Sequence, residues 1–229
     1  MIPCVKSSCG AWINEIDFEM KSYCLFIFSI IFSFPVISQN RFKAGIKAGI
    51  STCQVAGDTY SGFNKAGMVA GGFVKTKLNE NWGVQFEILY IQKGSKHNSN
   101  PDVGDYTFYL MKLNYLEVPL LFQYRNKKFS FEVGPGVGYL TSAKEYDTYG
   151  DITGLRPFNT TEVSFNVGIS YNLFKNLDIN WRYNNSLNAI REHASGATFW
   201  WNPGQQNNVL AFTLSYWFGK NENTSTDNK

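Results

Sequence analysis

The chain has 229 residues and a nearly balanced charge, with 21 Lys and Arg against 18 Asp and Glu, which gives a formal net charge of +3. The basic residues are scattered and form no stripe, which excludes the electrostatic footprint of a nucleic-acid-binding protein. The length suffices for one folded domain.

The first 38 residues are predicted to lie outside the mature domain. Residues 20–38 read MKSYCLFIFSIIFSFPVIS, in which Lys21 precedes an apolar stretch from Leu25 to Ile37. This is the layout of a secretory signal peptide, and the stretch is shorter than the about 20 apolar residues of a membrane-spanning helix. Residues 1–19 fit neither a signal peptide nor a domain, and we interpret them as sequence ahead of the true start codon. Among the four cysteines, Cys53 alone follows residue 38, so no internal disulfide can form.

After residue 38 the sequence alternates between apolar and polar residues, segment after segment. The clearest case is EVSFNVGISYNLF, residues 162–174, where every second residue is large and apolar. A period of two over this length predicts a strand with one apolar and one polar face. Seven further segments pass the same test, and in the weakest, 65–78, Val69 and Phe73 break the alternation. The eight predicted strands are 41–52, 65–78, 82–93, 108–125, 128–141, 162–174, 176–187 and 207–218.

The connections between these strands alternate in length. Those after the second, fourth and sixth strands are short, NEN, RNK and KN, whereas those after the first, third, fifth and seventh are long. Tight periplasmic turns and long extracellular loops are typical of bacterial outer-membrane barrels, which usually have an even number of strands. We therefore predict an all-β fold, an eight-stranded antiparallel up-and-down transmembrane β-barrel over residues 39–219 in the outer membrane. A disordered polar tail follows at 220–229.

The two faces of the strands indicate how the barrel is filled. In a membrane barrel the apolar face points to lipid and the polar face fills the interior. The polar face carries five cations and five carboxylates: Lys43, Lys47, Lys75, Lys77, Arg182, Glu87, Glu117, Glu132, Glu162 and Asp178. Eight strands enclose an interior just wide enough for side chains to fill, so we expect a closed, charge-filled interior and no open channel.

The stretch YLEVPLLFQYR, residues 115–125, places a charge and a proline inside an apolar run. Alternation directs Glu117 and Pro119 to the interior. Because an unpaired buried carboxylate is costly, we predict an interior charge cluster in which Arg182 serves both Glu87 and Glu117. Pro119 cannot donate to the strand ladder, so we expect a bulge or bend there.

Several segments resemble the PorT-like family of outer-membrane β-barrel proteins. They are FEILYIQKGS (86–95), LNYLEVPLLFQY (113–124), FEVGPGVGYL (131–140) and the final FTLSYWFGK (212–220). The resemblance covers most of the chain from Arg41 to Gly219. It implies an outer-membrane barrel, and because the founding member is implicated in type IX secretion, it implies an accessory role in that route. A terminal aromatic residue is the usual signal for the barrel-assembly machinery, an expected partner during insertion.

Three classes of function stay open from the sequence. We expect a structural or interaction barrel without enzymatic activity, metal or cofactor, whose partners are outer-membrane lipid and proteins at the extracellular loops. Trp200 and Trp201 are the candidate exposed loop contact. The alternative is an outer-membrane lipid-modifying enzyme, for which His193, near Glu192 and Ser195, is the candidate catalytic group. The third class is a soluble lipocalin-like barrel that binds a small apolar ligand.

Overall fold

The structure, a computed structural model, describes residues 42–60, 62–193 and 204–218. The signal-peptide, start-codon and tail predictions therefore fall outside the described residues. Among those residues, no helix is long and apolar enough to cross a membrane. The elements are β1 (Phe42–Ala56), β2 (Lys65–Lys77), β3 (Trp82–His97), the 3-10 turn η1 (Pro101–Val103), β4 (Tyr109–Asn126), β5 (Phe129–Asp147), β6 (Gly150–Asp151), β7 (Thr161–Phe174), β8 (Leu177–Ser186) and β9 (Gln206–Trp217).

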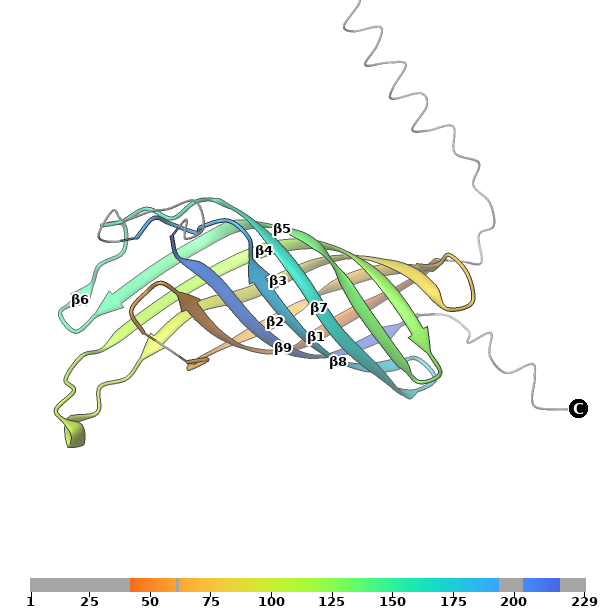
Figure 1. Ribbon diagram of the computed structural model, residues 1–229, viewed down its shortest axis with the longest axis horizontal. Helices are drawn as coiled ribbons and strands as arrows, with labels where there is room; N and C mark the ends of the chain where they lie inside the picture. Colours follow the sequence, from red (N-terminus) through yellow and green to blue (C-terminus); the bar gives the residue numbers. More distant parts are fainter. Residues whose placement is uncertain (1–41, 61, 194–203, 219–229) are drawn as a thin grey trace, which may run out of the picture. The chain divides into compact units, whose positions relative to one another are not determined.

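Eight of these strands form a closed antiparallel barrel (Figure 1). Each pairs with its neighbours along the chain, and β1 pairs with β9 to join the two ends of the sheet. Closure leaves no unpaired strand edge, which a sheet inside lipid requires. The short turns lie at one end of the barrel and the long loops at the other (Figure 1). The predicted eight-stranded up-and-down fold is confirmed.

The outward face of the barrel is apolar. Alternate residues of every long strand leave large hydrophobic side chains exposed, for example Ile46 at 57%, Phe86 at 45% and Val137 at 53%. This pattern also explains the weak alternation of β2: Val69 and Phe73 point inward and are buried, whereas Met68 points outward and is exposed. The residues that broke the pattern are thus apolar residues of the interior.

Aromatic side chains cover the outward surface near the short turns. The rings of Trp82 and Tyr124 lie 5.0 Å apart between centroids, and those of Phe129 and Tyr171 also 5.0 Å. Toward the long loops, Tyr139 is 60% exposed on the same outward face. Aromatic residues prefer the polar boundaries of the membrane, so these side chains mark the two levels at which the barrel leaves the hydrocarbon.

Several strands are longer than the alternation predicted. β3 continues to His97 and β5 to Asp147, where the predicted ends were 93 and 141. The two-residue strand β6 was not predicted, and it pairs only with the loop end of β5. These extensions form hairpins beyond the part of the sheet that faces lipid, and there no apolar face is needed to hold the strands together.

The prediction of a bulge at Pro119 is wrong. On the β3 side, Phe86 pairs with Leu120 and Leu89 with Glu117, so the register is the same before and after the proline. The register of β4 with β5 instead shifts at Asn114. There Thr141 is the extra residue of β5, and its Oγ1 donates to the Asn114 carbonyl at 2.9 Å. Pro119 therefore removes one donor from the ladder without moving the pairing.

The interior is not filled by charges alone. A cluster of buried apolar side chains lies between the charged residues, mainly on β1 to β4 and β9. Such a layer removes water from around the neighbouring ion pairs and strengthens them. Its members are Cys53, Val55, Val69, Leu89, Ile91, Tyr109, Met111, Leu113, Tyr115, Ile190, Val209 and Ala211.

Candidate functional site

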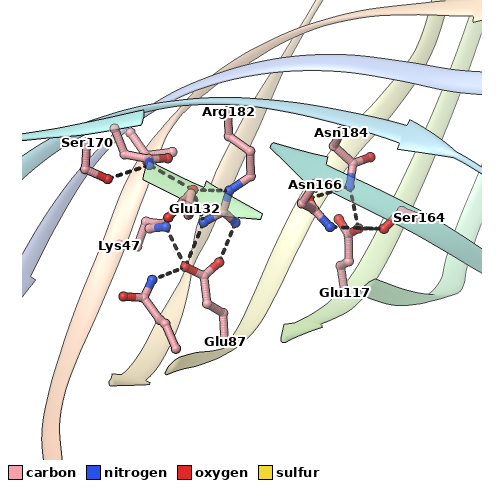
Figure 2. Close-up of polar contacts among 12 residues, drawn as sticks. Lys47, Glu87, Glu117, Glu132, Ser164, Asn166, Ser170, Arg182 and Asn184 are labelled. Atoms are coloured by element: carbon pink, nitrogen blue, oxygen red, sulfur yellow. Dashed lines mark hydrogen bonds and ion pairs between the residues drawn. The ribbon is translucent and has the colours of Figure 1, made fainter. Parts of the chain in front are cut away.

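The first group of interior charges, the Arg182 cluster, comprises Lys47, Glu87, Glu132 and Arg182 (Figure 2). Arg182 Nη1 and Nη2 donate to the two oxygens of Glu87 at 2.6 and 3.0 Å, and its Nε donates to Glu132 at 2.7 Å. Lys47 Nζ also donates to Glu87 at 2.6 Å. All four side chains are buried. Two cations face two carboxylates, so the cluster is electrically neutral.

Strand alternation and one glycine explain how these four side chains fit together inside the barrel. The four residues come from β1, β3, β5 and β8, each at an inward position of its strand. Gly168 of β7 leaves the space that Glu132 occupies, because a Cβ there would lie 2.7 Å from Glu132 Oε1 and 2.9 Å from the Trp181 carbonyl oxygen. The cluster therefore depends on a missing side chain as well as on the charges.

The second group, the Lys93 cluster, comprises Lys93, Glu117 and Glu162. Lys93 Nζ lies 2.8 Å from Glu162 Oε1 and 3.5 Å from Glu117 Oε2, and all three side chains are at most 2% exposed. One cation serves two carboxylates, and neutral donors supply the remaining hydrogen bonds. Ser164 and Asn184 donate to Glu117 at 2.6 and 2.7 Å. Glu162 accepts from Ser186 at 2.6 Å and from Asn207 at 3.0 Å.

Arg182 was predicted to serve both Glu87 and Glu117, and the structure corrects this prediction for Glu117. The structure brings Arg182 onto Glu87, but its second carboxylate is Glu132, and Glu117 lies apart from them beside Ser164 and Asn184 (Figure 2). Glu117 belongs instead to the Lys93 cluster. The reason is the register of β3 and β4, in which Glu117 lies opposite Leu89, two residues nearer the loops than Glu87. The sequence reasoning overlooked Lys93, although Lys93 lies six residues after Glu87 on the same alternating face.

The space between the two clusters is small. A void of ≈10 Å³ there is lined by residues of both clusters, including Lys47, Glu117 and Arg182. This is about the room that one water molecule needs. Side chains of the two clusters therefore fill most of this part of the barrel interior.

A third set of contacts lies at the loop end and is called the Arg191 cap: Tyr109, Phe158, Glu145, Arg191 and Gln205. Arg191 Nη1 and Nη2 donate to Glu145 at 2.7 and 2.6 Å, and its Nε donates to Gln205 at 2.6 Å. The Tyr109 hydroxyl also donates to Glu145. The Phe158 ring lies 4.4 Å from the Arg191 guanidinium carbon. Trp200 and Trp201, the predicted loop contact, lie outside the described residues.

His97, the last residue of β3, contacts a carboxylate of the loop that follows. His97 Nε2 lies 2.7 Å from Asp105 Oδ2, and the His97 ring stacks on Tyr60 at 4.7 Å between centroids. The hydroxyl and backbone N–H of Thr107 donate to Asp105 at 2.6 and 2.9 Å. These bonds, with that of His97, lower the pKa of the Asp105 carboxyl to about 2. These contacts tie the loop residues Asp105 and Thr107 to the end of β3 and to Tyr60.

The candidate set for a lipid-modifying enzyme, His193 with Glu192 and Ser195, lies only in part within the described residues. His193 lies next to Gly57, and Ser195 lies outside the described residues. Among residues 42–60, 62–193 and 204–218, no three His, Cys, Asp or Glu side chains are grouped to hold a metal ion.

Comparison with solved structures finds small outer-membrane proteins. Ail, the attachment invasion locus protein of Yersinia pestis, solved with the heparin analogue sucrose octasulfate, is 17% identical, with 78% of this chain and 99% of Ail covered and a TM-score of 0.45. Neisserial surface protein A is 15% identical, with 76% and 97% covered and a TM-score of 0.47. OprG from Pseudomonas aeruginosa is 16% identical, with 78% and 96% covered and a TM-score of 0.38. No curated protein matches the chain.

The family comparison is more direct. Residues 33–192 match the family described as outer membrane protein beta-barrel domain, which is well over half of the chain. Together with the apolar outward face, this match places the protein in the outer membrane. The soluble lipocalin-like interpretation is therefore wrong. The chain belongs to the outer membrane protein beta-barrel domain family.

Proposed function

We propose that this protein is a structural or interaction barrel that makes its specific contacts through its long loops, while its interior stays closed. The loop-side hairpins carry this proposal. β3, β4 and β5 have 16, 18 and 19 residues, whereas about 9–11 residues per strand suffice to cross the membrane. The additional residues extend the sheet on the loop side, where Tyr109 still pairs with Asp147. An extended, paired hairpin is a rigid platform for a partner outside the cell.

The partner class is tested by crosslinking in the native host. A photo-crosslinking residue at Tyr106 or Tyr149, which are 70% and 96% exposed on the loop side, should capture protein partners. The matched control is the same residue at Lys127, in the short turn between β4 and β5. Capture of lipid alone at both loop positions, with protein captured only at the turn, would contradict the proposal.

We further propose that the partner belongs to the type IX secretion route. The support is the resemblance of residues 86–95, 113–124 and 131–140 to PorT-like barrels, and these residues form the adjoining strands β3, β4 and β5. A deletion strain should then lose type IX cargo from the culture medium, and the wild-type gene should restore it. Normal secretion in the deletion strain would remove this assignment and leave the loop-contact proposal intact.

We propose that the protein has no enzymatic activity and that the barrel-assembly machinery inserts it. His97 is engaged with Asp105 and stacked on Tyr60, an arrangement that supports a structural role for this histidine. The alternative of a lipid-modifying enzyme predicts a change in lipid A acylation. Mass spectra of lipid A from the deletion strain should match those of the parent strain, and a lost or gained acyl chain would favour the enzyme.

A further inference from the structure

The periplasmic mouth of the barrel, at the end with the short turns, contains cavities that are lined by cations and by buried hydrogen-bond donors. Two cavities of ≈30 and ≈50 Å³ lie there, and both are lined by Arg125, Ser130 and Trp217. The shared walls make them two parts of one recess. Each part is large enough for a few water molecules or one small polar group.

The recess is strongly basic. Six cations line it, whereas two carboxylates, Glu80 and Asp178, do so. Asp178 is paired with Lys75 at 3.4 Å, so one of these two carboxylates is already engaged. The ammonium of Lys75 also lies 3.7 Å from the centroid of the Trp217 ring. The six cations are Lys43, Lys75, Lys77, Arg125, Lys127 and Lys128.

Two buried hydrogen-bond donors in the walls have no acceptor among the described residues. They are the indole N–H of Trp217 and the hydroxyl of Ser130, whose residues are 4% and 9% exposed. Buried polar groups in native proteins are nearly always paired. Both residues line both parts of the recess, and Ser130 is the register partner of Arg125 in the pairing of β4 with β5. Unpaired donors and excess positive charge therefore occur at the same place.

We infer that this recess binds an oxyanion group, a phosphate or a carboxylate, presented from the periplasm. Such a group supplies the acceptors that Trp217 and Ser130 lack among the described residues, and it brings negative charge to a lining rich in cations. Arg125 matches it best, because the guanidinium fork fits the two oxygens of a carboxylate or phosphate. The small volume admits the anionic group itself and leaves the rest of its carrier outside. The site is independent of the loop contacts proposed above, because it lies at the other end of the barrel.

The test uses the full chain in zwitterionic detergent micelles, with the indole N–H resonance of Trp217 as the readout. Inorganic phosphate and hexaglutamate are titrated separately, at an ionic strength held constant with sodium chloride. A saturable shift of this resonance is expected, since a new acceptor changes the environment of the indole proton. Response to phosphate alone identifies a small free anion as the source, and response to hexaglutamate alone identifies an acidic partner chain. Both outcomes support the site.

Variants show whether the response comes from the recess. Arg125→Gln should weaken binding about tenfold or more, the effect of losing one charge-assisted hydrogen bond. Lys144→Gln removes one exposed cation at the loop end and should leave the affinity unchanged. The gel shift between unheated and boiled samples confirms that each variant is folded. The inference is overturned if neither probe shifts the resonance, if chloride shifts it equally, or if both variants bind as the wild type does.

Discussion

Removal of Arg182 tests how strongly the interior charges hold the barrel together. Arg182→Met takes away both bonds to Glu87 and the bond to Glu132 and keeps an unbranched side chain in the same space. Glu87 retains Lys47, but Glu132 is left with neutral donors, including Asn180 at 2.9 Å. Because this leaves a buried carboxylate without a cation, we expect a loss of about 3–5 kcal/mol in the free energy of unfolding, as for other broken buried pairs.

The assay is urea unfolding of the barrel in lipid vesicles, followed by the fluorescence of its tryptophans. Lys144→Met is the matched control, because Lys144 is exposed and its replacement should change stability by no more than about 0.5 kcal/mol. Adding Glu132→Gln to Arg182→Met should restore part of the loss, since it removes the charge left without a partner. A loss below about 1 kcal/mol for Arg182→Met, or simple addition of the two single effects, would refute the reasoning.

In the Lys93 cluster, Lys93→Met should lower the free energy of unfolding by about 3–5 kcal/mol. Glu117→Gln should lower it by about 1 kcal/mol, because glutamine keeps one acceptor oxygen and relieves the excess of negative charge. Equal losses for the two variants in urea unfolding would contradict this. Gly168→Ala should destabilise the folded barrel by about 1–3 kcal/mol through overpacking. In Gly72→Ala the new Cβ would meet only a backbone oxygen at 3.6 Å, so the midpoint of urea unfolding should stay unchanged. The pKa of the Asp105 carboxyl is lowered from 3.8 to about 2. Its hydrogen bonds therefore stabilise the folded hairpin fully above pH 3.8 and lose this effect as the pH falls through 2. A midpoint near pH 4 for Asp105 in an NMR titration would contradict the geometry.

The fold follows from the sequence because alternation reports directly which face each residue occupies. In β7, the apolar residues predicted to point outward are exposed, as for Phe165 and Val167, and the polar residues between them are buried, as for Ser164 and Asn166. The alternation of short and long connections then fixes which ends of the strands are joined tightly. Barrel closure needs no further signal, because an open sheet edge in lipid is too costly.

The partners across the interior could not be obtained in the same way. A period of two gives the face of Glu117 but not its height along the barrel, which depends on the offset between strands. The offset between β3 and β4 places Glu117 opposite Leu89 and within reach of Lys93. Lys93 itself was obscured because Leu89 and Ile91, on the same face, are apolar.

The Arg191 cap was also beyond sequence reasoning, for a different reason. Arg191 lies in a long connection without periodicity, and its partner Glu145 lies in the part of β5 that extends past the predicted end of the strand. Contacts between loops depend on how each loop folds over the barrel mouth. Residue spacing alone carries no information about that path.

The central claim is that the interior of the barrel is closed to ions. Conductance across a planar lipid bilayer tests this claim most directly. Reconstituted wild-type protein should give no steady conductance above the bare bilayer, because the Arg182 and Lys93 clusters fill the interior and the void between them is ≈10 Å³. An open porin inserted in the same bilayer shows that insertion and recording succeed. Stable, long-lived conductance steps from the folded wild-type barrel would contradict the account.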